Sequence, residues 1–193
     1  MAIGTDPGIV PQSISRALAI PIVKIKTIRA EAGNEDDAAY PEHAIAVIGM
    51  GCKFPGADSV DEFWDLLAGG KSMLDRIPNE RFDRDAKFPR SPKTNLPFWG
   101  NFVRDIEAFD HKFFKKSARE AASMDPQQRL LLQVAYQALE SSGYFSDPSN
   151  PRDIGCYLGA CSTDYDGNVG SHPPTAYSTT GTLRAFLSGR LSQ

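Results

Sequence analysis

Residues from which metal centres and disulfide frameworks are built are scarce in this sequence. The three cysteines, which have no CxxC spacing, are Cys52, Cys156 and Cys161. The three histidines, which lie far apart along the chain, are His43, His111 and His172. Because zinc sites and disulfide frameworks need closely spaced ligands or paired cysteines, we expect neither. We predict reduced, mostly buried thiols in an intracellular protein.

A long apolar run and an excess of positive charge are missing as well. No stretch reaches the roughly 20 apolar residues that cross a bilayer, and the N-terminus lacks the basic-then-apolar order of a secretory signal. The 21 basic side chains against 24 acidic ones give a net charge of −3. This balance offers no cationic surplus to nucleic acid or anionic lipid. We expect a cytoplasmic protein with neither a nucleic-acid nor a membrane partner.

Apolar residues, by contrast, are plentiful enough for a real core, at 41% of 193 residues.

The composition changes near residue 44. Residues 1–43 combine glycine and proline near their start with an acidic, alanine-rich stretch, and we expect a linker there, with residues 20–26 compatible with one short strand. Residues 44–193 are expected to form the folded region.

Residues 44–49 form a continuous apolar run that is typical of a strand buried on both faces of a sheet. Residues 153–160 predict another buried strand, whose glycines allow neighbouring backbone to come close. Between them, residues 71–109 mix prolines with aromatic rings, and we expect an excursion pinned to the body by those rings. Strands of this kind belong to a mostly parallel sheet with helical cover, so we predict an α/β fold. Two strands are too few for an independent sheet, and we expect the fold to be incomplete.

Helix starts and stops are marked clearly. Two capping boxes, in which serine precedes glutamate by three residues, are Ser59 with Glu62 and Ser117 with Glu120. Asp125 as cap and Pro126 in the first turn begin a helix that Gly143 ends. Apolar residues cover more than one face of this helix, which predicts burial between layers. Residues 180–191 predict a further helix.

Glycines at 49 and 51, directly after a predicted strand, invite comparison with the dinucleotide-binding fingerprint. The third glycine of that fingerprint falls at Phe54, and the next helix begins only near Ser59. We therefore favour a tight turn after the strand. A nucleotide-binding module is kept as the weakest of the functional hypotheses.

Cys161 ends the second predicted strand, where a thiol serves as a nucleophile if a helix N-terminus and a histidine lower its pKa. Turn-forming residues follow it instead, and we expect a buried structural cysteine. The start of a calcium loop is suggested by Asp164, Asp166 and Asn168. Its twelfth position holds Thr175 rather than glutamate, which excludes that site.

Polar groups gather at residues 125–129 (DPQQR), at the front of the predicted buried helix. We expect Asp125 to cap the helix and Arg129 to form an ion pair with a carboxylate from a neighbouring segment. These patterns indicate part of an α/β domain that lacks a complete set of catalytic residues.

Several long segments resemble the N-terminal half of a type I β-ketoacyl synthase domain. They are residues 44–56 (AIAVIGMGCKFPG), 59–67 (SVDEFWDLL), 109–114 (FDHKFF), 118–132 (AREAASMDPQQRLLL) and 138–143 (ALESSG). Two further segments most resemble the iterative, non-reducing polyketide synthases of filamentous fungi. They are residues 98–102 (FWGNF) and 171–190 (SHPPTAYSTTGTLRAFLSGR).

The resemblance implies the N-terminal part of a thiolase-like fold, which is built from two βαβαβ halves and is usually dimeric. It implies an acyltransferase that performs decarboxylative condensation, in which a cysteine at a helix N-terminus accepts the growing acyl chain and two histidines assist decarboxylation of malonyl. The implied partners are an acyl carrier protein with its phosphopantetheine, the remainder of the ketosynthase domain and a second copy. It also implies a preceding starter-unit acyltransferase, whose tail is expected within residues 1–43. No cofactor is expected on this chain.

The sequence departs from that family in its catalytic motifs. The nucleophile motif Asp-Thr-Ala-Cys-Ser-Ser and both histidine motifs are expected beyond Gln193, and neither Cys161 nor His172 corresponds to them. We therefore assign no catalytic, cofactor-binding or metal-binding residue and expect a truncated ketosynthase that is inactive alone. The alternative is a noncatalytic interaction or dimerisation remnant of such a synthase.

Overall fold

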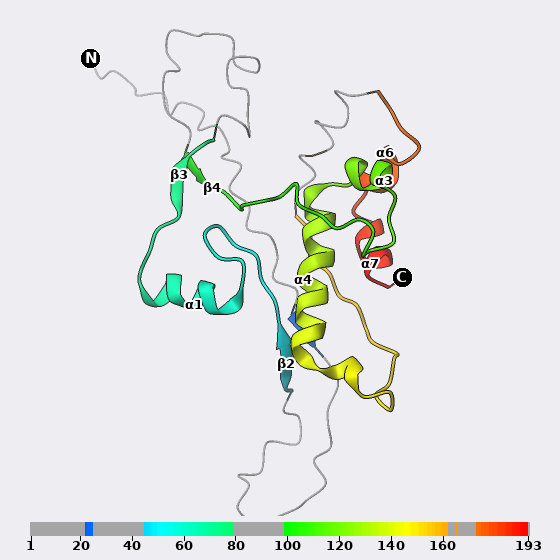
Figure 1. Cartoon of the computed structure of the whole chain (residues 1–193), viewed down its shortest axis with the longest axis horizontal. Helices are drawn as coiled ribbons and strands as arrows, with labels where there is room; N and C mark the ends of the chain where they lie inside the picture. The colour runs from blue at the N-terminus through cyan, green and yellow to red at the C-terminus, as the bar shows by residue number, and fades with distance from the viewer. Residues whose placement is uncertain (1–21, 25–44, 79–98, 162–164, 166–172, 193) are drawn as a thin grey trace, which may run out of the picture.

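The computed structural model describes residues 22–24, 45–78, 99–161, 165 and 173–192 (Figure 1). Their elements, in chain order, are β1 (Ile22–Lys24), β2 (Val47–Met50), α1 (Val60–Ala68), β3 (Leu74–Arg76), β4 (Trp99–Asn101), α3 (Ala118–Ser123), α4 (Pro126–Ser142), the 3-10 helix η1 (Tyr144–Ser146), α6 (Ser178–Thr182) and α7 (Phe186–Leu191). Helix α4 lies at the centre of this arrangement, with β2 beside its C-terminal part and α3, α6 and α7 near its beginning. The predicted α/β class is confirmed.

The strands form two antiparallel pairs. Strand β1 pairs with β2. Its position confirms that residues 20–26 contain one short strand. The run at 44–49 yields β2, but the prediction of burial on both faces is wrong, since Val47 and Met50 are 54% and 55% exposed. The prediction of a mostly parallel sheet also differs from the described residues, in which both pairings are antiparallel.

Residues 153–160 were expected to form a second buried strand, and the structure contradicts this. The segment carries no strand, and Tyr157 within it is 93% exposed. An apolar, β-prone run becomes a strand only when a neighbour accepts its backbone hydrogen bonds. In the part of the chain that the structure describes, β2 has its pairing partner in β1 instead.

Helix α4 follows its predicted boundaries and burial. Asp125 is its N-cap, Pro126 is its first residue, and Gly143 ends it in the left-handed conformation with a φ of 62°. Its buried apolar residues are Leu130, Leu132, Val134, Ala135 and Ala138. They cover more than one face, because α4 contacts both β2 and α7.

Gly49 and Gly51 allow β2 and the residues after it to touch the backbone of α4. A Cβ at Gly51 would lie 2.7 Å from the Val134 carbonyl oxygen, and one at Gly49 would fall on the Ala138 carbonyl. Neither glycine has a positive φ. The predicted tight turn is therefore corrected: these glycines permit close packing between helix and strand.

The serine caps are found where they were predicted. Ser59 Oγ accepts from the Glu62 amide at 3.2 Å, and Ser117 Oγ accepts from the Glu120 amide at 3.1 Å. In a full capping box, the glutamate carboxylate also accepts from the backbone amide of the serine. Here the Glu62 carboxylate accepts from the Asp58 amide instead, at 2.8 Å. The Glu120 carboxylate instead accepts from Arg190, which lies 70 residues further along the chain.

The predicted helix over 180–191 is divided into α6 and α7. Leu183 adopts an extended conformation with a ψ of 126°, which ends α6. Gly181 lies against the carbonyl of Ser123 at the end of α3, so that a side chain at this position would fall on the backbone. Close packing of α6 on α3 thus accompanies the break in the helix.

The excursion over residues 71–109 is described at its two ends. Strands β3 and β4 pair there, and the Arg76 guanidinium lies 5.5 Å from the ring centroid of Trp99. Next to the excursion, Phe113 packs edge-on against Tyr136 of α4 at 4.9 Å. Phe82, Phe88 and Phe98 lie outside the described residues.

Candidate functional site

Asp125 lies where the start of α4 meets α6. Its Oδ1 accepts a hydrogen bond from the Gln127 amide at 2.7 Å, which satisfies a free N–H group in the first turn. The Asp125 amide in turn donates to the Gly181 carbonyl at 2.8 Å. One buried residue therefore begins the helix and also attaches it to a segment more than fifty residues away.

Arg129, one turn further along α4, pairs with Glu107. Its Nη2 and Nη1 lie 3.3 Å and 3.4 Å from Glu107 Oε2. The prediction that Arg129 holds a carboxylate from a neighbouring segment is confirmed. Because the Arg129 side chain is 7% exposed and that of Glu107 is 79% exposed, water screens the attraction and the pair contributes little to stability.

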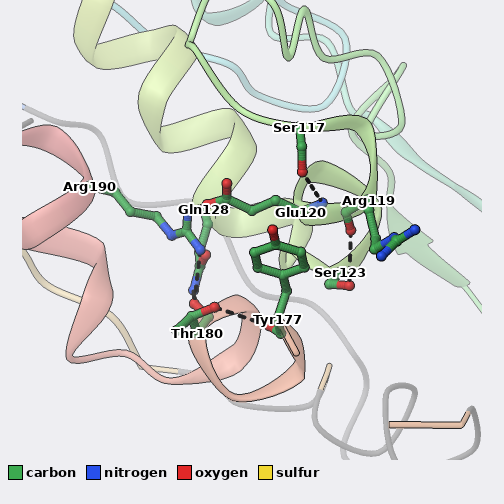
Figure 2. Close-up of polar contacts among 8 residues, drawn as sticks. All are labelled: Ser117, Arg119, Glu120, Ser123, Gln128, Tyr177, Thr180 and Arg190. Atoms are coloured by element: carbon green, nitrogen blue, oxygen red, sulfur yellow. Dashed lines mark hydrogen bonds and ion pairs between the residues drawn. The ribbon is translucent and has the colours of Figure 1, made fainter. Parts of the chain in front are cut away.

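A second arginine, Arg190 of α7, joins three helices from within the protein (Figure 2). Its Nη1 lies 2.6 Å from Glu120 Oε1 of α3, and its Nη2 donates to the Thr180 carbonyl of α6 at 3.1 Å. The amide of Gln128, on α4, donates to the same carbonyl at 3.4 Å. The side chains of Arg190 and Glu120 are 7% and 20% exposed.

This polar cluster, formed by Glu120, Gln128, Thr180 and Arg190, is suited to fixing helices relative to one another. Glu120 is held in an ion pair with Arg190, so each charge compensates the other in a largely dry position. Sharing the Thr180 carbonyl between two donors fixes the backbone in the middle of α6. The cluster therefore positions the 180–191 region on the body.

The three thiols lie in different environments. Cys52 is buried as predicted; burial raises the pKa of its thiol, and the nearby charges of Asp58 and Glu62 raise it further. Cys156 and Cys161 are exposed, so the expectation of mostly buried thiols is wrong for these two. The reason is that residues 153–160 do not enter a sheet that would cover them.

Among the three histidines, His111 lies within the described residues. His111 Nδ1 lies 2.9 Å from the Lys116 carbonyl oxygen, so this nitrogen carries the proton and donates it. The remaining histidines and the calcium-loop residues fall outside the described residues; they are His43, His172, Asp164, Asp166 and Asn168. Over the residues with described positions, no group of three His, Cys, Asp or Glu side chains could hold a metal ion. Among those same residues, no helix is long and apolar enough to cross a bilayer.

Sequence reasoning missed Arg190 as a member of the site and placed Glu120 only in a capping box. The pair spans 70 residues of chain, a separation for which no local spacing rule exists. One signal was present, because Arg190 lies in the helix predicted over 180–191, next to Leu191 and one turn after Leu187, where helical spacing places an apolar stripe. A charged residue in such a stripe indicates a buried partner.

Helices packed on a strand through glycine contacts, with a buried polar cluster near their beginning, define part of a layered α/β domain. The family model of the β-ketoacyl synthase N-terminal domain matches residues 42–193. The chain therefore belongs to the β-ketoacyl synthase family.

Known relatives agree with this assignment. Methylphloroacetophenone synthase of Cladonia uncialis is 59% identical over 207 aligned residues, covering 100% of this chain and 8% of the relative. A non-reducing polyketide synthase of Preussia isomera is 64% identical, covering 79% of this chain and 6% of the relative. The resemblance to fungal non-reducing polyketide synthases is confirmed.

A solved structure supports the thiolase-like ketosynthase fold. The ketosynthase from module 6 of the bacillaene synthase of Bacillus subtilis 168 is 32% identical, with a TM-score of 0.57. The match covers 74% of this chain and 23% of that structure. This chain thus spans under a tenth of the two fungal relatives and about a quarter of the solved ketosynthase.

Proposed function

We propose that this chain is part of a ketosynthase that condenses an acyl thioester with malonyl held on an acyl carrier protein. In this reaction a cysteine thiolate takes the acyl group, malonyl loses carbon dioxide, and the resulting carbanion attacks the thioester and releases the thiol. The observation that carries the proposal is the match of residues 42–193 to the β-ketoacyl synthase N-terminal domain, together with 64% identity to a non-reducing polyketide synthase over 79% of the chain.

The contribution of this chain to that reaction is a scaffold. Helix α4 is buried between β2 and α7. Asp125 and Gln128 attach its first turns to α6, and Arg129 pairs with Glu107. Arg190 of α7 joins α3 and α6. Such attachments hold a catalytic domain in one geometry, which condensation requires because the reacting atoms must meet within about 3–3.5 Å. The proposed partners are the remainder of the ketosynthase domain, a second copy of it, and the carrier protein with its phosphopantetheine-bound substrate.

Residues 1–43 are proposed to be a linker that includes the tail of a preceding starter-unit acyltransferase. Two observations support this: the family model begins only at residue 42, yet the alignment with methylphloroacetophenone synthase spans the whole chain. The cytoplasm is the proposed site of action.

The 193-residue chain by itself is proposed to be inactive in condensation, because no nucleophile with an adjacent base is assigned to it. The alternative function is a noncatalytic interaction or dimerisation remnant. The exposed apolar residues of β2, Val47 and Met50, favour that alternative, because such a strand readily accepts a protein partner.

A segment exchange separates the two functions. The aligned segment of methylphloroacetophenone synthase is replaced by these 193 residues, and incorporation of radiolabelled malonyl into polyketide is measured. We expect the hybrid to retain product formation within about tenfold of the parent. A matched hybrid carrying Gly51→Leu should lose product, because the new side chain meets the α4 backbone.

The outcome that contradicts the proposed function is a hybrid that folds and dimerises like the parent but forms no product. Size-exclusion chromatography and circular dichroism establish folding and dimerisation independently of activity. Condensation by the isolated 193-residue chain would contradict its proposed inactivity.

A further inference from the structure

Residues 173–192, here called the strap, lie against α3 and α4 but bury little apolar surface. The strap contains α6 and α7, helices of five and six residues, which are too short to be stable in isolation. Leu187 is its one buried large apolar side chain among the described residues, whereas Leu183 and Phe186 are 47% and 40% exposed. The hydrophobic effect therefore contributes little to holding the strap in place.

Polar contacts hold it instead. The Gly181 carbonyl accepts from the Asp125 amide at 2.8 Å, the Thr180 carbonyl accepts from Gln128 Nε2 at 3.4 Å, and the hydroxyls of Thr175 and Ser123 lie 3.1 Å apart. Each of these contacts joins the strap to α3 or to the start of α4. A typical neutral hydrogen bond makes only a modest net contribution, so none of them alone fixes the strap.

The ion pair between Arg190 and Glu120 is the strongest of these attachments. Its atoms are 2.6 Å apart and largely buried, and Arg190 also holds the Thr180 carbonyl within the strap (Figure 2). Removing the carboxylate leaves a buried guanidinium uncompensated, which favours a state in which Arg190 reaches water.

The body beneath does not depend on the strap in the same way. Helix α4 keeps its contacts with β2 through Gly49 and Gly51, and its own caps are Asp125 and Gly143. Its apolar residues Leu130, Leu132, Val134 and Ala138 belong to the core. Opening of the strap therefore leaves most of the packing of α4 intact.

We propose that the strap is a separate opening unit of this protein and that the Arg190–Glu120 ion pair is its latch. When the latch opens, α6 and α7 leave α3 and α4 together, and the buried face of Gln128 becomes accessible to solvent. This inference concerns the chain itself and is independent of the proposed condensation activity.

Hydrogen exchange of the hybrid synthase that carries these 193 residues, followed by mass spectrometry, tests the proposal. In the unsubstituted chain, amides of residues 178–191 should exchange faster than those of residues 130–138, which shows that the two units open separately. Glu120→Gln, which removes the charge while keeping the shape, should accelerate exchange in 178–191 about tenfold or more. Exchange in 130–138 should change less than about twofold.

Glu107→Gln is the matched control. It removes one carboxylate and one ion pair at the start of α4, but its partner Arg129 lies outside the strap. We expect no change in residues 178–191. Equal exchange of strap and α4 in the unsubstituted chain overturns the proposal, as does a Glu120→Gln variant in which both segments accelerate together or the strap does not respond.

Discussion

Replacement of Gly51 by alanine tests the close packing between α4 and the segment that follows β2. The added Cβ would lie 2.7 Å from the Val134 carbonyl oxygen and 3.1 Å from the Ala138 nitrogen. The shorter distance is about 0.8 Å below a comfortable separation of about 3.5 Å, and both neighbours are backbone atoms, so the helix itself must move.

The expected cost follows from this overlap. Overpacking of a well-fitted site costs typically about 1–3 kcal/mol, and alanine recovers up to about 1 kcal/mol by restricting the unfolded chain. We therefore expect a net loss of about 1–2 kcal/mol in the free energy of unfolding. For a chain of this size, this loss corresponds to a fall in Tm of about 2–8 °C.

Urea unfolding followed by circular dichroism at 222 nm measures this loss. The control is Gly159→Ala, because a Cβ at Gly159 meets no atom within 4 Å. That variant should stay within about 0.5 kcal/mol of the unsubstituted chain. If Gly51→Ala also stays within this limit, with an unchanged slope of the transition, the reasoning about backbone contact is refuted.

Three further outcomes are expected. Asp125→Ala should lower the free energy of unfolding by about 1–2 kcal/mol and Asp125→Asn by less, measured by urea unfolding, because asparagine still accepts from the Gln127 amide. Lys115→Gly should raise the Tm, since Lys115 has a φ of 53° and the left-handed region costs a non-glycine residue about 1 kcal/mol or more. Ellman's reagent at pH 8 should modify the exposed Cys156 and Cys161 quickly and the buried Cys52 slowly. The raised pKa of Cys52 lowers its thiolate fraction, so the rate at which Cys52 is modified should rise with pH. Three equally fast thiols would contradict this expectation.

The candidate site was partly predictable. Asp125 as a cap and Arg129 as the partner of a carboxylate follow from residue types at the front of a buried helix, and both are confirmed. The identity of the acid, Glu107, does not follow from any spacing. The polar cluster was not foreseen, because Glu120 satisfies the local rule for a capping box while its carboxylate binds Arg190.

The strand predicted at residues 153–160 is absent from the structure and shows the same limit in the fold. Ile154 and Tyr157 favour an extended backbone, and the segment contains no helix. Whether such a segment joins a sheet depends on a hydrogen-bonding partner, and the run itself carries no information about one.

What the sequence by itself determined is the local structure whose causes lie within a few residues: the serine caps of α1 and α3, the beginning of α4 at Asp125 and its end at Gly143. These interactions close over one helical turn, so residue type and spacing suffice. Only the tertiary structure decided that Gly49 and Gly51 serve helix packing and that Glu120 meets Arg190. Contacts between residues that are distant in sequence depend on how the whole chain packs, because burial and charge compensation arise only when the segments meet.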